Sequence, residues 1–187
     1  TVTMKGIASF FFILTGLIAM TENTALPKYM GALTIAGACL GMIGDIVLDL
    51  KFVYPKDGDK YLKIGFISFL FGHLFYSGSL ITAYGLNKTN ILFGIGGFIL
   101  IKVMKMKADG KMRIIMAVYY ATLAYKAASA FVLALSDGQI AFWVAFAGAC
   151  LFIISDTCLA FLYFTPVKRK NVFVTVELST YYTAQIL

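Results

Sequence analysis

Charged residues are scarce in this chain. Lys, Arg, Asp and Glu make up 13% of the 187 residues, whereas hydrophobic residues make up 60%, and the mean hydropathy is +0.86. An ordinary soluble domain has about 25% charged residues. The composition therefore excludes a soluble globular domain and predicts an all-α, polytopic membrane protein that forms one transmembrane domain over residues 1–187.

Cysteine, proline and histidine are also rare, with three, three and one residues. Cys39, Cys150 and Cys158 lie within apolar runs without paired spacing, so we interpret them as small core residues rather than a disulfide framework or a thiolate metal site. A zinc hydrolase is disfavoured because such sites use several histidines. A metal site of Asp and His alone stays an alternative, and we predict no cofactor.

Apolar runs of nearly membrane-spanning length recur along the whole chain. The seven candidate spans are residues 4–20, 29–50, 62–85, 89–104, 113–135, 139–164 and 171–187. The chain begins with Thr1 rather than Met and enters an apolar run almost at once. We therefore expect one further helix upstream, which would make eight spans in the full-length protein.

Cations alternate between the joints that connect these spans. Twelve lie in every second joint, against two, Lys28 and Lys88, in the opposite joints. The twelve are Lys51, Lys56, Lys60, Lys63, Lys102, Lys105, Lys107, Lys111, Arg113, Lys168, Arg169 and Lys170. The positive-inside rule places these joints in the cytoplasm, together with Lys5. The net charge of +7 then reflects topology and contact with anionic membrane lipids, not nucleic-acid binding.

Six ionisable residues lie inside the predicted spans, where each is a candidate functional residue because a charge at bilayer depth is costly. They are Asp45, Asp49, His73, Lys126, Asp156 and the more peripheral Glu177. At about 1.5 Å per residue from the nearest cytoplasmic cation, Asp45 lies about 9 Å deep, His73 about 15 Å, Asp156 about 18 Å and Tyr181 about 17 Å. These four depths predict a common pocket.

Structural interpretations compete with functional ones at each position. Asp49 lies one turn below Asp45, where a solvated interfacial role is favoured, and His73 alone would be read as a core histidine. Lys126 either pairs with a buried carboxylate or contacts a substrate phosphate. Tyrosines in these spans are ordinarily packing residues: Tyr76, Tyr119, Tyr120, Tyr181 and Tyr182. For Asp45 and Asp156 a functional role is favoured, because Lys126 cannot neutralise both carboxylates.

Four short motifs resemble those of the YhhN family of membrane lysoplasmalogenases. They are GDIVL at 44–48, GHLFY at 72–76, ISDTCLA at 154–160 and TYYTAQ at 180–185. Their order and spacing run along nearly the whole chain. Residues 4–6, Met-Lys-Gly, stand where the family has Lys-Pro at the start of its second span, which again suggests a missing first helix.

The resemblance implies hydrolysis of the vinyl-ether bond of a lysophospholipid, giving a fatty aldehyde and glycerophospho-ethanolamine or -choline. Such hydrolysis needs a carboxylic acid and a nearby anion, and a carboxyl group shielded from water keeps its proton more readily. We assign Asp156 as acid and Asp45 as anion and base. The expected supporting residues are His73, Tyr76, Ser155, Tyr181, Tyr182 and Gln185, and the expected headgroup contacts are Asp49, Lys5 and Lys126.

A protein of a different class, a small-molecule or proton-coupled transporter or a lipid receptor, also uses buried Asp, His and Lys residues. No paired halves with broken helices are visible in the sequence. The enzyme is therefore the favoured reading, and its oligomeric state stays open.

Overall fold

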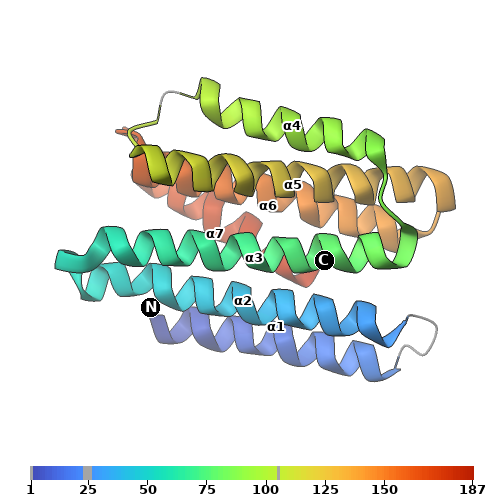
Figure 1. The fold of residues 1–187 in the computed structure, drawn as a ribbon. Coiled ribbons are helices and arrows are strands. Elements are labelled where there is room, and N and C mark those ends of the chain that lie inside the picture. The colour runs from blue at the N-terminus through green and yellow to red at the C-terminus, as the bar shows by residue number, and fades with distance from the viewer. Residues whose placement is uncertain (1, 23–26, 105) are drawn as a thin grey trace. The chain divides into compact units, whose positions relative to one another are not determined.

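The computed structural model describes residues 2–22, 27–104 and 106–187. Over these residues the chain is helical and has no β-strand, which confirms the all-α fold class (Figure 1). The elements are α1 (Val2–Glu22), α2 (Lys28–Val53), the 3-10 helix η1 (Pro55–Asp57), α3 (Gly58–Tyr84), α4 (Lys88–Val103), α5 (Gly110–Asp137), α6 (Ile140–Phe164) and α7 (Lys170–Ile186). They form two compact units, Thr1–Asn87 and Lys88–Leu187. The single domain expected from the sequence stays a prediction.

Each predicted span corresponds to one helix, with ends that agree to within about four residues. Five of the described helices, α1, α2, α3, α5 and α6, are long and apolar enough to cross a membrane, as an integral membrane protein requires. The other two, α4 and α7, have 16 and 17 residues, or about 24 and 26 Å, against a hydrocarbon core of about 30 Å. The count of seven spans therefore stays a prediction.

Glycine and aspartate define the ends of the longest helices. Gly85 ends α3 with a φ of 82° and Gly138 ends α5 with a φ of 71°, a backbone region that favours glycine. Asp109 caps the start of α5, where its side chain accepts a hydrogen bond of 2.6 Å from the backbone N–H of Met112. Residues 23–26 of the first predicted joint, and Lys105 in a later one, lie outside the described residues.

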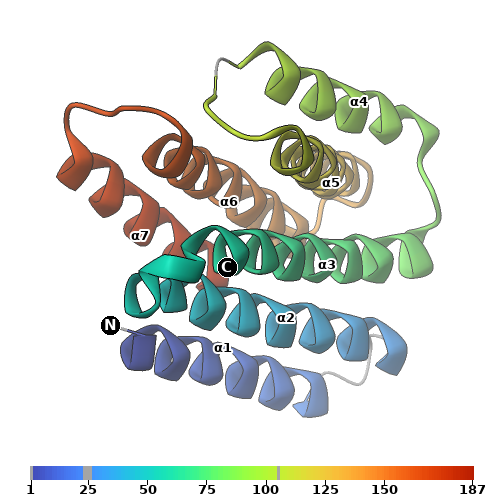
Figure 2. The ribbon, with the colours of Figure 1, turned by 60° about the vertical axis from the view of Figure 1, so that its left-hand side comes forward.

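In the first unit, α2 packs against both α1 and α3 (Figure 2). Small residues bring α2 and α3 close together: a Cβ added to Gly37 would lie 2.9 Å from the carbonyl oxygen of Gly72, and Ser68 donates a hydrogen bond of 2.7 Å to the carbonyl of Leu40. The buried face of α2 also carries Asp45. Close packing thus fixes the position of this carboxylate.

The three cysteines, which the sequence predicts to be small core residues, lie only partly within the core. Cys39, Cys150 and Cys158 are free thiols, and each is only half-buried. In α2 the reason is the helix face, because the buried positions include Gly37 and Gly41 but not Cys39.

In the second unit, α5 packs against α4 and α6, and α6 packs against α7. The backbone N–H of Lys107, before α5, donates a hydrogen bond of 2.8 Å to the carbonyl of Phe164, at the end of α6. Arg113 donates from Nη2 to the carbonyl of Met106 over 2.9 Å. The basic joint before α5 and the one after α6 therefore lie at the same end of this unit, as predicted.

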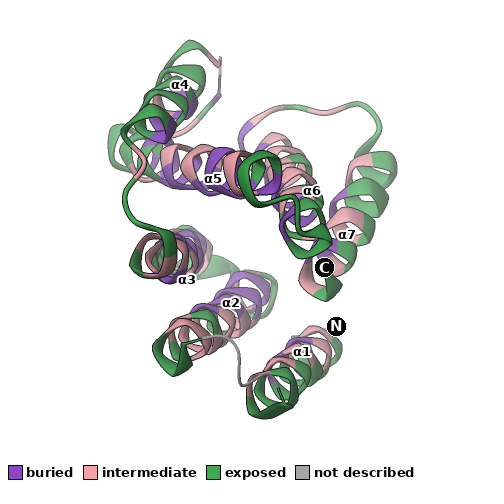
Figure 3. Cartoon of the chain, turned by 90° about the vertical axis from the view of Figure 1, so that its right-hand side faces the viewer, coloured by how far each residue is buried: buried purple, intermediate pink, exposed green. Residues whose placement is uncertain are grey.

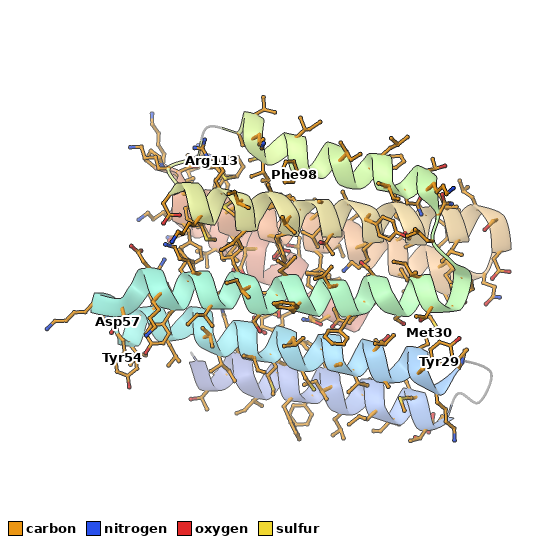
Figure 4. All side chains as sticks on the ribbon, in the orientation of Figure 1. Tyr29, Met30, Tyr54, Asp57, Phe98 and Arg113 are labelled. Atoms are coloured by element: carbon orange, nitrogen blue, oxygen red, sulfur yellow. The ribbon has the colours of Figure 1, made fainter. Side chains whose placement is uncertain are left out.

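Large apolar residues are exposed on the helices of both units, as expected of surfaces that contact lipid, and Figure 3 colours the exposed residues green. Phe11 on α1 is 57% exposed, and Leu92 on α4 is 66% exposed. Exposed tyrosines mark both ends of α2, Tyr29 at its start and Tyr54 just after its end (Figure 4). Tyrosine is enriched at both membrane interfaces, so this arrangement supports a membrane-spanning α2.

Candidate active site

In the first unit, two polar contacts join α1 to α2. Ser9 Oγ donates a hydrogen bond of 2.7 Å to Asp45 Oδ2, and Lys5 Nζ lies 3.1 Å from Asp49 Oδ1. Ser9 follows Lys5 by four residues, and Asp49 follows Asp45 by four, so two antiparallel helices bring both pairs into register. The result is a short polar ladder within apolar helices.

Both aspartates of this ladder are buried, with Asp45 4% and Asp49 6% exposed. The burial of Asp49 differs from the solvated position expected from the sequence, because Lys5 of the neighbouring helix covers and neutralises its carboxylate. Two predicted headgroup residues, Lys5 and Asp49, are thus brought together.

Helix α3 contributes the predicted histidine and tyrosine of the first unit. His73 is 2% exposed, and its ring centroid lies 5.8 Å from that of Tyr76. Tyr76 lies within electrostatic range of Asp45, and its ring packs where a Cβ on Gly37 would lie. The close approach of α2 and α3 therefore brings Tyr76 within electrostatic range of the first candidate acid.

In the second unit, the other candidate acid is held by a tyrosine of α5. Tyr119 donates a hydrogen bond of 2.6 Å from its hydroxyl to Asp156 Oδ2, and both side chains are buried. The adjacent Tyr120 donates instead to Thr157 Oγ1, over 3.2 Å. Two neighbouring phenols thus have different partners on α6, and only one of them binds the carboxylate.

Lys126 lies over an aromatic ring in the same unit. Its Nζ is 4.5 Å from the ring centroid of Phe152, and the ammonium is within electrostatic range of Asp156. The Phe152 ring meets the ring of Tyr181 edge-on at 5.7 Å, and the Tyr181 hydroxyl accepts a hydrogen bond of 3.0 Å from Gln185 Nε2. Helices α5, α6 and α7 thus bring three other predicted residues into one cluster around Asp156: Lys126, Tyr181 and Gln185.

Two other predicted residues of this unit serve different contacts. Ser155 is 1% exposed and donates its hydroxyl to the backbone carbonyl of Glu177 over 3.1 Å, which links α6 to α7. Tyr182 is half-buried, with its ring centroid 5.5 Å from that of Tyr181. Ser155 therefore contributes to helix packing. Tyr182 lies at the margin of the cluster around Asp156.

Ser9 was missed in the sequence, and Tyr119 was interpreted there only as a packing aromatic. Each is the direct hydrogen-bond donor to a candidate acid. The helical spacing carried a weak signal for both, since Ser9 lies one turn from Lys5 and Tyr119 lies two turns from Lys126 on the same helix face.

The predicted pocket of Asp45, His73, Asp156 and Tyr181 combines residues of both units and stays a prediction. Among residues 2–22, 27–104 and 106–187, no group of three or more His, Cys, Asp or Glu side chains is placed to hold a metal ion. Asp45 accepts a hydrogen bond from Ser9 and Asp156 accepts one from Tyr119, and Lys126 lies within electrostatic range of Asp156.

The family model of the YhhN family matches residues 3–187. The chain belongs to the YhhN family. No curated protein and no solved structure matches the chain. The match covers all four motifs that carry the resemblance, and therefore also the polar ladder of the first unit and the cluster around Asp156.

Proposed function

We propose that this YhhN-family protein hydrolyses the vinyl-ether bond of lysoplasmalogens. One observation carries the proposal: two membrane-spanning helices each bury an aspartate that accepts a hydrogen bond from a hydroxyl group of a neighbouring helix. Buried carboxylates are costly in an apolar environment, and they cluster where a protein handles protons. Asp45 and Asp156 are the two acids that the reaction requires.

The reaction proceeds through an oxocarbenium ion. A carboxylic acid transfers its proton to the β-carbon of the vinyl ether, and the electrons of the C=C bond form the new C–H bond. Water then adds to the resulting cation and gives a proton to a carboxylate, which forms a hemiacetal. The C–O bond to the glycerol breaks as that oxygen receives a proton and the hemiacetal hydroxyl loses one. The products are a fatty aldehyde and an alcohol, and one water is consumed.

The negative charge of the second carboxylate stabilises the oxocarbenium ion where its charge develops. The two roles require one carboxyl group that carries a proton and one that is ionised. This division of labour resembles the carboxylate pair of glycoside hydrolases by analogy only.

The Lys5–Asp49 pair suits a zwitterionic headgroup, which offers a phosphate for the ammonium and an amine for the carboxylate. Both residues lie close to the basic joint after α2, since Lys5 is near the start of α1 and Asp49 near the end of α2. We infer that this joint is cytoplasmic, on the strength of the twelve-to-two division of cations. Lys126 remains a second candidate for the phosphate.

The test is an assay of purified protein in detergent with a 1-alkenyl lysophospholipid. Mass spectrometry should find fatty aldehyde and glycerophospho-ethanolamine or -choline in equal amounts. An enzyme releases both products without a membrane gradient, whereas a transporter or a receptor releases neither. The absence of aldehyde with a full panel of headgroups would contradict the proposal.

A further inference from the structure

We propose that Tyr119 is a positioning residue that holds Asp156 as the carboxylate, so that Asp156 is the anion of the reaction and not its proton donor. This inference rests on the proposed function. It reverses the assignment of Asp156 as the acid, which depth along the sequence suggested.

The contact between α5 and α6 carries the argument. The Tyr119 hydroxyl lies 2.6 Å from Asp156 Oδ2, and the two side chains are 2% and 6% exposed. A short hydrogen bond from a phenol is of the charge-assisted kind when its acceptor is ionised. Burial of both groups keeps water from competing with it, so the donor stabilises the charged form of Asp156.

A cation supports the same state of Asp156. Lys126 lies seven residues after Tyr119, about two turns along the same face of α5, and its ammonium is within electrostatic range of Asp156. Phe152 lies one turn before Asp156 on α6, and its ring fixes the ammonium at 4.5 Å from the ring centroid. Donor and cation thus approach Asp156 from two positions on α5.

In the proposed reaction these contacts give Asp156 two tasks. Its negative charge stabilises the oxocarbenium ion, and it accepts the proton of the attacking water. Tyr119 itself gives up no proton, because it only orients one carboxylate oxygen. Its loss should therefore reduce turnover rather than substrate binding.

The kinetic test compares Tyr119→Phe with Tyr120→Phe. Both residues are buried neighbours on α5, and both variants lose one hydroxyl, but the hydroxyl of Tyr120 binds Thr157. We expect Tyr119→Phe to lower kcat about tenfold to a hundredfold with KM within about twofold, and Tyr120→Phe to keep both within about twofold. The double variant Tyr119→Phe/Asp156→Asn should be no slower than Asp156→Asn alone.

A purely structural Tyr119 would give independent, multiplying losses in that double variant, which would overturn the inference. Equal kcat in Tyr119→Phe and Tyr120→Phe would also overturn it. An inactive wild type would instead overturn the proposed function, and the spectroscopic test below does not depend on turnover.

The spectroscopic test uses only wild type and Asp156→Asn, so it does not depend on the folding of Tyr119→Phe. Their infrared difference spectrum at neutral pH, with 13C-labelled aspartate, reports the protonation state of Asp156 directly. We expect the wild type to show a carboxylate band that is missing in the variant. If the band that the variant loses is instead the C=O band of a protonated carboxyl group, the inference is overturned, whatever the enzyme assay shows.

Discussion

The two units hold a buried aspartate with different neighbouring groups. Each buries an aspartate next to a hydroxyl from a neighbouring helix, a serine in the first unit and a tyrosine in the second. The first unit adds the ion pair of Lys5 and Asp49 one turn away, near the helix ends. The second adds a lysine held over an aromatic ring within the apolar part of α5. The two acids therefore differ both in their hydroxyl donors and in the charged groups near them.

The largest expected effect is the loss of activity when the buried aspartate of either unit is replaced. Asp45→Asn and Asp156→Asn should each lower vinyl-ether hydrolysis about a hundredfold or more, because Asn can neither donate an acidic proton nor carry the charge. The measurement is kcat in detergent, with thermal unfolding as the folding control. Asp59→Asn, at an exposed position on α3, should leave both unchanged. Near-normal turnover in both Asp45→Asn and Asp156→Asn would show that these acids have a structural or transport role instead.

Helix packing in the first unit gives the next effect, which concerns stability. A Cβ on Gly37 would lie 2.9 Å from both the Gly72 carbonyl oxygen and the Tyr76 ring. Gly37→Ala should therefore lower the free energy of unfolding by about 1–3 kcal/mol, through strain between α2 and α3. Gly96→Ala is the matched control, because nothing lies within 4 Å of its added Cβ. Equal thermal unfolding of the two variants would show that α2 and α3 do not meet at this glycine.

The serine of the first unit should matter less than the tyrosine of the second. Ser9→Ala removes the hydroxyl bound to Asp45 and should lower kcat about threefold to tenfold, since an aliphatic hydroxyl is a weaker donor than a phenol. The control is Thr15→Val, because the Thr15 hydroxyl binds the backbone carbonyl of Phe11 within the same helix. A larger loss in Ser9→Ala than in Tyr119→Phe would reverse the comparison.

The smallest effect is expected at the margin of the second cluster. Tyr182 is half-buried and stacks edge-on against Tyr181. Tyr182→Phe keeps the ring, so kcat should fall about threefold at most. A loss as large as that of the Asp156→Asn variant would place the Tyr182 hydroxyl in the reaction itself.

Sequence patterns predicted the positions of the helices well, but not which side chains contact the candidate acids. The hydropathy reading began the third helix at residue 62, but α3 begins at Gly58, because a helix backbone continues through polar residues where hydropathy falls. The acids themselves were found, since a charge inside an apolar run is conspicuous. Ser9 was not found and Tyr119 was interpreted as a packing residue, because serine and tyrosine are ordinary in spans. Their roles depend on the register between helices, which a single sequence does not show.

Deuterium incorporation tests the central claim most directly, because the proposed reaction adds a solvent proton to the β-carbon of the vinyl ether. Purified protein should turn over a 1-alkenyl lysophospholipid in D2O, and mass spectrometry should follow the fatty aldehyde, with an aldehyde standard as the exchange control. The account predicts one deuterium on the carbon next to the aldehyde group, and little or no product from Asp45→Asn or Asp156→Asn. Aldehyde without deuterium, or none at all, would contradict it.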